Sequence, residues 1–200
     1  MGGGFMHAYE MERLLKKVEK TNDKELLYLI KKLIQEKEQL EKLVNKDSLT
    51  GLNNRRGLNT IKNYTAAVMC DIDDYKHVND SFGHIMGDSV IKIVSSVIKR
   101  NIREKDYVCR YGGDEFLIVF IDCPTNIVYN RVETIRKCAE SSIILPNNEK
   151  ISMSFGIAIN ENSKTITDLI QKADKALYES KENGKNKITV FEEKNKEKKL

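Results

Sequence analysis

The sequence predicts an α+β domain in which helices pack on a mostly antiparallel sheet, preceded by an N-terminal helical segment. Short apolar runs typical of buried strands alternate with segments whose apolar residues recur at helical spacing. Two of these strands are separated by little more than Gly112 and Gly113, a pattern typical of an antiparallel hairpin. A length of 200 residues allows one domain of ordinary size plus an appendage.

The first segment, residues 9–46, is highly charged and carries apolar side chains at helical spacing. Three leucines recur every seven residues, at Leu26, Leu33 and Leu40. This pattern is typical either of a short coiled coil or of an amphipathic helix packed on its own domain. We expect Thr21, Asn22 and Asp23 to interrupt the segment and to cap a helix that starts near Lys24.

The remaining elements follow a charged stretch that ends at Lys46. Strands are expected at 66–73, 107–111, 115–121, 151–159 and 187–191, and helices at about 87–102, 125–141 and 166–182. Gly112 and Gly113 are expected to take positive φ in a tight turn. Residues 192–200 form a charge run typical of a solvated end. The predicted organisation is therefore a helical segment at 1–46, a domain at 47–191 and a charged tail at 192–200.

Composition excludes several classes of protein. The net charge is only +4, from 34 basic and 30 acidic side chains, so we expect no nucleic-acid partner. The longest apolar run, Phe116–Ile121, is too short to cross a membrane, and the N-terminus lacks the pattern of a signal peptide. The 4 cysteines form no CxxC pair, which favours free thiols and a cytoplasmic location.

Acidic residues gather at the ends of predicted strands. Asp71 and Asp73 end the first strand, and Asp114 and Glu115 follow the two glycines. If the first strand lies beside the hairpin, Asp71 and Asp114 meet at one end of the sheet. Two carboxylates and a backbone carbonyl suit Mg²⁺ or Mn²⁺, ions that commonly bridge nucleotide phosphates. The alternative is a set of solvated acids that cap nearby turns.

Two further polar features lie near predicted helix ends. Residues 76–88 are polar and glycine-rich and precede a helix N-terminus, an arrangement that favours an anion or polar ligand but is also common in plain loops. Lys181 and Lys185 lie near the end of the last predicted helix. They could reach phosphates, or they could form a solvated basic helix end.

The heptad Arg110–Phe116, RYGGDEF, resembles the signature of the GGDEF family, the diguanylate cyclases. Other family motifs follow in order: Asp47–Arg56, Asp71–Lys76, Asn79–His84, Gly87–Asp88, Ser154–Ile157, Ala173–Asp174, Leu177–Tyr178 and Lys181–Asn186. The resemblance covers about residues 47–191. Several short motifs in the right order are a far more specific signal than any one of them.

The resemblance implies a fold and a reaction. The fold is the ferredoxin-like palm core that this family shares with class III nucleotidyl cyclases. The reaction condenses two GTP molecules into cyclic di-GMP and releases pyrophosphate. Because each subunit holds one GTP, catalysis in the family requires a homodimer.

The resemblance also assigns roles by position. Asp71 and Asp114 would bind Mg²⁺ (or Mn²⁺), assisted by the carbonyl of Ile72, and Glu115 would act near the 3′-hydroxyl as a metal ligand or base. The substrate-binding residues would be Asn79 and Asp88 at the guanine edge, and Lys76, Lys181 and Lys185 at the phosphates.

Two of these residues bear on how the substrate is held. Asp88 can accept from both N1–H and the N2 amino group of guanine, a donor pair that adenine lacks, so it favours GTP. Lys185 stands where the family often has arginine, and it keeps the charge but loses the bidentate fork.

A regulatory motif is implied as well. Arg103 and Asp106 fit the RxxD inhibitory site, where the family binds a dimer of the product, cyclic di-GMP. A second arginine often completes that site. Its equivalent here is Thr134, with Arg131 and Arg136 nearby, so the strength of product inhibition is left open.

Other readings remain open. The chain could be a degenerate GGDEF module that binds GTP or cyclic di-GMP and signals by contact, a cyclase that makes a mixed cyclic GMP–AMP, or a structural dimeriser that acts through its N-terminal helix. The presence of every matched metal, guanine and catalytic residue favours the active cyclase. We further expect the helical segment to set dimer geometry.

Overall fold

The computed structural model describes Arg13 and residues 16–17, 23–161, 163 and 165–193. The chain divides into two units, one ending at Asn45 and the other beginning at Lys46. No helix in the described part of the chain is long and apolar enough to cross a membrane.

Helix α2, Lys24–Val44, is the main element of the first unit. It begins where the sequence predicts, and the Oδ1 atom of Asp23 accepts a hydrogen bond from the Leu26 amide at 3.0 Å. Leu26 and Leu33 are 41% and 63% exposed on the single chain. Most of the predicted segment before Asp23, and the side chain of Leu40, lie outside the described residues.

The second unit is built on a six-stranded sheet with the order β1-β3-β4-β2-β5-β6. The strands are β1 (Asn53–Asn54), β2 (Tyr64–Ile72), β3 (Tyr107–Arg110), β4 (Glu115–Ile121), β5 (Met153–Ile159) and β6 (Ile188–Val190). The β2–β4, β2–β5 and β3–β4 pairs are antiparallel, and only the β1–β3 and β5–β6 pairs are parallel. The predicted mostly antiparallel sheet is therefore confirmed.

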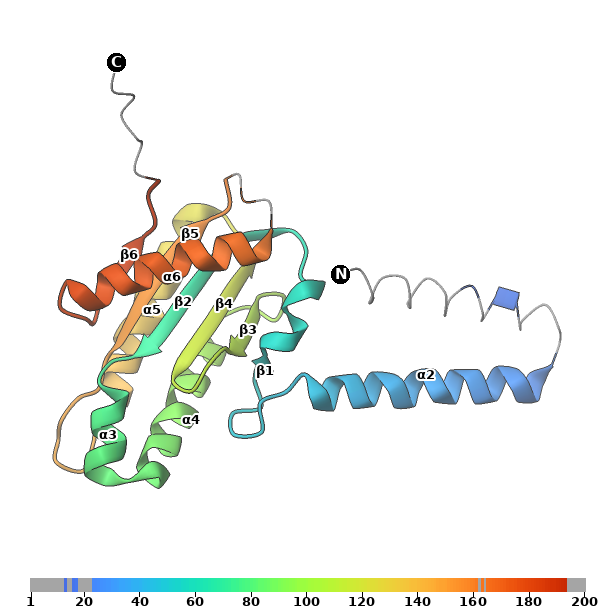
Figure 1. The fold of residues 1–200 in the computed structure, drawn as a ribbon, viewed down its shortest axis with the longest axis horizontal. Helices are drawn as coiled ribbons and strands as arrows, with labels where there is room; N and C mark the ends of the chain where they lie inside the picture. The colour runs from blue at the N-terminus through green and yellow to red at the C-terminus, as the bar shows by residue number, and fades with distance from the viewer. Residues whose placement is uncertain (1–12, 14–15, 18–22, 162, 164, 194–200) are drawn as a thin grey trace, which may run out of the picture. The chain divides into compact units, whose positions relative to one another are not determined.

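Helices cover both faces of this sheet (Figure 1). They are the 3₁₀ helix η1 (Arg55–Thr60), α3 (Tyr75–Phe82), α4 (His84–Asn101), α5 (Thr125–Ser142) and α6 (Ile166–Glu182). Figure 1 shows α6 in front of the sheet and α4 and α5 behind it. The polypeptide thus forms three layers, with the sheet in the middle.

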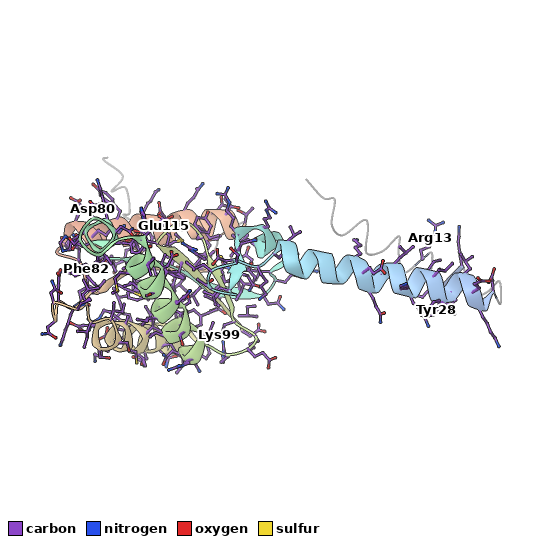
Figure 2. The ribbon with its side chains drawn as sticks, turned by 90° about the horizontal axis from the view of Figure 1, so that it is seen from below. Arg13, Tyr28, Asp80, Phe82, Lys99 and Glu115 are labelled. Atoms are coloured by element: carbon purple, nitrogen blue, oxygen red, sulfur yellow. The ribbon has the colours of Figure 1, made fainter. Side chains whose placement is uncertain are left out.

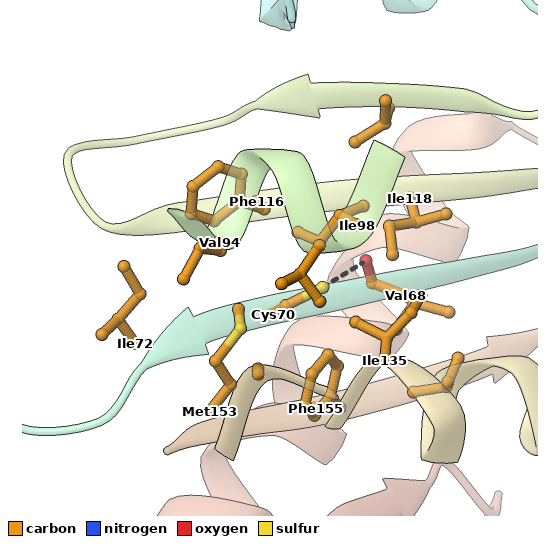
Figure 3. Close-up of a cluster of buried hydrophobic side chains, with 14 of the residues drawn as sticks. Val68, Cys70, Ile72, Val94, Ile98, Phe116, Ile118, Ile135, Met153 and Phe155 are labelled. Carbon is orange, nitrogen blue, oxygen red and sulfur yellow. Dashed lines mark hydrogen bonds between the residues drawn. The ribbon is translucent and has the colours of Figure 1, made fainter. Parts of the chain in front are cut away.

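The alternation of side chains along β2 feeds two separate hydrophobic clusters. Val68, Cys70 and Ile72 face α4 and α5, whereas Ala67 and Met69 face α6. Figure 3 shows the first cluster, in which these β2 side chains lie among residues of β4 and β5 and of helices α4 and α5: Phe116, Ile118, Met153, Phe155, Val94, Ile98 and Ile135. Burial of both faces explains why the central strands are apolar throughout.

Helix α6 packs unusually close to β5. A Cβ atom at Gly156 would lie 2.1 Å from the Leu177 backbone nitrogen, so only glycine fits at this crossing. The helix starts with a capping box, in which the Thr165 hydroxyl and the Asp168 carboxylate each accept from the other residue's amide at 3.1 Å. The start and the close contact together fix where the last turn of α6, with Lys181, lies against the sheet.

The structure corrects the prediction for residues 76–88. This segment is not a loop, because α3 occupies Tyr75–Phe82 and α4 starts at His84 rather than near Gly87. Val78 is buried and Phe82 packs against the same cluster one turn later, which gives α3 an apolar face. Gly83, with φ of 81°, separates the two helices.

Smaller differences concern the element ends. The sequence prediction contained neither β1 nor η1, both of which are short and polar. Strand β4 has its predicted bounds. The bounds of the other predicted strands differ by one or two residues, and β2 begins at Tyr64.

Candidate active site

The predicted meeting of two acidic strand ends is observed. In the antiparallel β2–β4 pair Asp71 lies opposite Glu115, and the Ile72 amide donates to the Asp114 carbonyl at 3.4 Å. Asp71 is buried, and burial raises the pKa of its carboxyl to about 6. Lys181 opposes this rise in the pKa, whereas the neighbouring charges of Asp114 and Glu115 add to it.

The turn between β3 and β4 differs from the expected one. Neither Gly112 nor Gly113 takes positive φ, and the amides of Tyr111 and Gly112 both donate to the Glu115 carbonyl, at 2.8 and 3.3 Å. A Cβ atom at Gly112 would lie 2.4 Å from Oε2 of Glu115. Glycine at this position lets the Glu115 side chain fold back over the turn, and a Cβ atom there would force that carboxylate to move.

Arg110 holds this turn by hydrogen bonds to its backbone. Its Nε and Nη2 donate to the Gly113 carbonyl at 2.9 and 2.7 Å, and its Nη1 lies 3.3 Å from Asp47. Asp47 also accepts from the amide and hydroxyl of Thr50. Burial acts to raise the pKa of Asp47, but the Thr50 hydrogen bonds and Arg110 outweigh it and the pKa is lowered. The motif that opens the domain therefore supports the turn, a role that the sequence did not reveal.

Asn79 and Asp88, the predicted guanine-binding pair, lie on α3 and α4 where these helices cross. A Cβ atom at Gly87 would lie 2.1 Å from Oδ1 of Asn79 and 2.8 Å from the Tyr75 hydroxyl. Oδ1 of Asn79 is buried and has no hydrogen-bond partner among the described residues, whereas Asp88 is exposed. An unpartnered buried acceptor beside an exposed carboxylate suits a ligand that donates two hydrogen bonds.

Tyr75 is a site residue that the sequence analysis missed. Burial raises the pKa of its phenol, and the charges of Asp88 and Asp114 raise it further. The hydroxyl thus lies within the electrostatic reach of both Asp88 and the carboxylate of Asp114. In the sequence, Tyr75 directly follows Asp73 and Asp74 at the end of a predicted strand, and this position could have indicated a site residue.

Both predicted phosphate-binding lysines near the end of α6 reach the acidic end of the sheet. Nζ of Lys181 lies 2.8 Å from Asp71, and Nζ of Lys185 donates to Asp74 at 2.6 Å. The hydrogen bond that Lys185 donates to Asp74 raises the pKa of Lys185. Lys76 is exposed in the first turn of α3. Asp73 turns away from Asp71 and accepts from Ser152 and Ser154, so it is not part of this carboxylate group.

Comparison with known proteins places this arrangement in a family. The protein-family model described as "Diguanylate cyclase, GGDEF domain" matches residues 44–187 of this chain. The chain belongs to the GGDEF family. The match includes the β3–β4 turn, helices α3 and α4, and Lys181 and Lys185.

Curated relatives agree with this family. The chain is 36% identical to Diguanylate cyclase A of Treponema denticola over 132 residues, which are 64% of this chain and 36% of the relative. It is 35% identical to Diguanylate cyclase DosC of Escherichia coli over 181 residues, or 84% of this chain and 39% of the relative. The chain therefore spans less than two fifths of the length of these relatives.

Solved GGDEF structures share the fold. The coiled coil and GGDEF domain of DgcB from Caulobacter crescentus, in complex with c-di-GMP, is 29% identical with a TM-score of 0.71 and covers 83% of this chain and 95% of that one. The active GGEEF domain of a diguanylate cyclase from Vibrio cholerae is 27% identical with a TM-score of 0.64 and covers 70% and 97%. The palm-like cyclase fold is thereby confirmed.

The GGDEF carboxylates have the chemistry of a divalent-cation site. Within the described part of the chain, no three histidine, cysteine, aspartate or glutamate side chains are placed to hold a metal ion by themselves. Mg²⁺, however, is usually bound by one or two carboxylates together with substrate phosphates. Burial is the main cause of the raised pKa of Asp71, and the like charges of Asp114 and Glu115 add to it. A cation would offset these charges. The donor set fits the ion.

Arg103 and Asp106, the RxxD residues, bind each other at the end of β4 opposite to Glu115. Nε and Nη2 of Arg103 donate to Asp106 at 2.9 and 2.6 Å, and Nη2 also donates to the Ile121 carbonyl at 2.9 Å. The Asp106 side chain is 0% exposed, and it also accepts from the Ile121 amide. Figure 2 shows Lys99 at the far end of α4 from Phe82 and α3. Lys99 and Arg103 line a cavity of about 360 Å³ there.

Proposed function

We propose that this chain condenses two GTP molecules into one cyclic di-GMP with release of two pyrophosphates. The observation that carries the proposal is the meeting of Asp71, Asp114 and Lys181 at one end of the β2–β4 pair. The names of the curated relatives, all diguanylate cyclases, support it.

Asp71, Asp114 and Glu115, with the Ile72 carbonyl, would hold one or two Mg²⁺ or Mn²⁺ ions. Such ions neutralise charge that develops on the phosphoryl oxygens and orient the reacting groups. The protein's share is positioning and electrostatic preorganisation. Glu115 lies beside the substrate's 3′-hydroxyl in this proposal, and the braced turn keeps its carboxylate in place.

The nucleotide would lie between the α3–α4 crossing and the end of α6. The unpartnered Oδ1 of Asn79 and the exposed carboxylate of Asp88 accept the hydrogen bonds of the guanine edge. Lys181 and Lys185 exchange their aspartate partners for phosphate oxygens, and Lys76 is close in sequence to the same end. Adenine offers no matching donor pair, so the site selects GTP.

Two chains are needed for one product. Each proposed site holds a single GTP, and the 3′-hydroxyl of one nucleotide attacks the α-phosphate of the other across a homodimer. The exposed Leu26 and Leu33 of α2 give this chain an apolar seam with which to associate.

The four cysteines are free, and GTP is a cytoplasmic metabolite, so we assign the enzyme to the cytoplasm.

Product inhibition is proposed at the cavity beside Arg103. The cavity lining holds three basic residues, Lys46, Lys99 and Arg103, against the acidic Glu104 and Asp106, and its excess positive charge suits the phosphates of cyclic di-GMP. Asp106 would act by holding Arg103 rather than by gripping the ligand, because its side chain is buried and already accepts several hydrogen bonds. The hydroxyl of Thr134 donates to the Asn130 carbonyl and supplies no charge, so inhibition should be weak.

The test is an incubation of the purified chain with Mg²⁺ and GTP, ATP or both, followed by chromatography of the products. The proposal predicts cyclic di-GMP from GTP alone and no mixed product when ATP is added. A mixed cyclic GMP–AMP would replace the proposal by the second cyclase reading. Nucleotide binding without any turnover would favour a degenerate module.

A further inference from the structure

The turn after α6 has an unusual backbone. Gly184, Lys185 and Asn186 all have positive φ, of 102°, 59° and 46°. Glycine tolerates this conformation, but lysine seldom adopts it. A turn of this kind persists only where the surrounding structure holds it. The residue that it presents is Lys185, one of the two lysines assigned to the phosphates.

Hydrogen bonds of Asn186 hold this turn against the rest of the domain. Its amide donates to Oδ2 of Asp73 at 3.0 Å, and its Nδ2 donates to Glu140 at 2.9 Å. Nη1 of Arg136 donates to Oδ1 of Asn186 at 2.7 Å and to its carbonyl at 3.4 Å. All four polar groups of this one residue are therefore engaged, and two of them by Arg136.

Arg136 is itself fixed on α5. Its Nε and Nη2 form a bidentate pair with Glu133, at 2.8 and 2.9 Å, and its Nη1 lies 3.4 Å from Glu140. The arginine side chain is only 16% exposed. The planar guanidinium thus contacts two carboxylates and Asn186 at once, which an ammonium group cannot reproduce.

The other support of Asn186 comes from the strand that carries Asp71. Asp73 is buried and accepts from the hydroxyls of Ser152 and Ser154, both at 2.6 Å, as well as from Asn186. One end of the network is therefore anchored two residues from the proposed metal ligand, and the other on the outer helix α5.

We propose that Arg136 is a positioning residue for the triphosphate of the substrate. Arg136 acts through Asn186, whose contacts hold the left-handed turn. The turn in turn places Lys185, and it follows the last turn of α6, which carries Lys181. The inference rests on the proposed function. Arg136 touches no substrate atom in this scheme, and the guanine edge is bound by other helices, so only the phosphate end of the nucleotide depends on it.

The experiment measures equilibrium binding of two ligands in the presence of Mg²⁺. One is a GTP analogue with a methylene bridge between the α- and β-phosphorus atoms, which cannot release pyrophosphate, and the other is GMP. The variants are Arg136→Gln and Arg136→Lys. The matched control is Arg131→Gln, which removes an arginine of the same helix whose Nη1 contacts the Asn101 carbonyl.

We expect Arg136→Gln to raise the Kd of the analogue about tenfold or more and that of GMP less than twofold. Arg136→Lys should fall between it and wild type, and Arg131→Gln should bind both ligands normally. Should Arg136→Gln fail to fold, Asn186→Gly serves instead, because it keeps the freedom for positive φ and removes only the side-chain contacts.

Equal analogue binding by wild type and the folded variant would overturn the inference and leave the proposed function standing. An equal loss for both ligands would overturn it too, because general damage to the site would then explain the result. A wild-type chain that binds neither ligand would instead overturn the proposed function.

Discussion

At the residue scale, two acceptors define the proposed choice of base. Asn79 supplies a buried acceptor without a partner, and Asp88 supplies an exposed carboxylate one helix away. A hydrogen bond to a charged acceptor contributes about 1.5–3 kcal/mol, enough for roughly a 10- to 100-fold preference. The choice between GTP and ATP should therefore depend strongly on one side chain.

We predict that Asp88→Ala lowers the ratio of kcat/KM for GTP to that for ATP by about 10- to 100-fold. Steady-state kinetics with each nucleotide measures this ratio. Glu179→Ala, which removes an exposed carboxylate from α6, is the control and should leave the ratio unchanged. A ratio that Asp88→Ala does not alter would contradict the guanine assignment.

Asp106 illustrates a residue whose pattern suggested ligand binding and whose contacts are structural. Burial acts to raise the pKa of its carboxyl, but hydrogen bonds from Arg103 and from the Ile121 amide outweigh burial, and the pKa is lowered. A lowered pKa in the folded state stabilises the fold above the unfolded pKa, and this contribution is lost as the pH falls through the folded value.

Asp106→Asn should therefore lower the free energy of unfolding at pH 7 by about 2–4 kcal/mol, because Arg103 loses its charged partner. The variant should also lose less stability than wild type between about pH 4 and pH 2. Urea denaturation at several pH values measures both effects, with Glu104→Gln on the same loop as the control. Parallel pH profiles for Asp106→Asn and wild type would contradict the account.

At the element scale, the close packing of α6 on β5 sets where Lys181 meets Asp71. A Cβ atom at residue 156 would collide with backbone atoms of Ala173 and Leu177, at 2.2 and 2.1 Å. Backbone cannot rotate away as a side chain can. The helix would have to move, and its last turn would move with it.

We predict that Gly156→Ala destabilises the protein by about 1–3 kcal/mol or more, although alanine normally stabilises a strand relative to glycine. Gly113→Ala is the control, since a Cβ atom there meets nothing within 4 Å and the backbone has no positive φ. Its free energy of unfolding should change little. If chemical denaturation ranks the two variants equally, the packing argument is wrong.

The elements that the sequence predicted best are those with a strong apolar pattern. The strands around Asp71 and Glu115 and helices α4 to α6 were found close to their predicted positions, because burial on both faces leaves a clear signature. Helix α3 was missed because its apolar face is essentially Val78 and Phe82, with Tyr75 only half-buried.

The candidate site likewise contains residues whose placement the sequence predicted and residues whose contacts it did not. Asp71, Asp114 and Lys181 were brought together as predicted, since strand pairing and helix direction determine their meeting. Gly112 and Gly113 were expected to take positive φ, and neither does. At Gly112 the constraint is instead the close approach of the Glu115 side chain, which the sequence alone does not show. Asn186 gave no signal for its contact with Arg136, which lies 50 positions away in the chain.

At the scale of the whole molecule, each chain supplies one proposed nucleotide site, and the proposed reaction needs two. Leu26 and Leu33 lie exposed on α2 at heptad spacing, and burial of such residues in a partner helix drives association. The helical segment should thus raise the fraction of chains that are paired at a given concentration.

Deletion of residues 1–45 is predicted to lower both the dimer fraction and the turnover per chain at micromolar concentration. Leu26→Gln combined with Leu33→Gln in the full chain should act in the same direction, whereas Tyr28→Gln, off the leucine row, should not. Sedimentation analysis and product assays at matched concentrations provide the measurements. Unchanged dimerisation and turnover after the deletion would exclude this role.

The central claim is that the carboxylates at the end of the β2–β4 pair carry out cyclic di-GMP synthesis. It is tested most directly by measuring cyclic di-GMP formation from GTP and Mg²⁺ by wild type and Asp114→Ala, with folding of the variant confirmed by circular dichroism. We expect steady product formation by wild type and a loss of at least about a thousandfold in the variant. Full activity in folded Asp114→Ala, or no cyclic di-GMP from wild type, would contradict it.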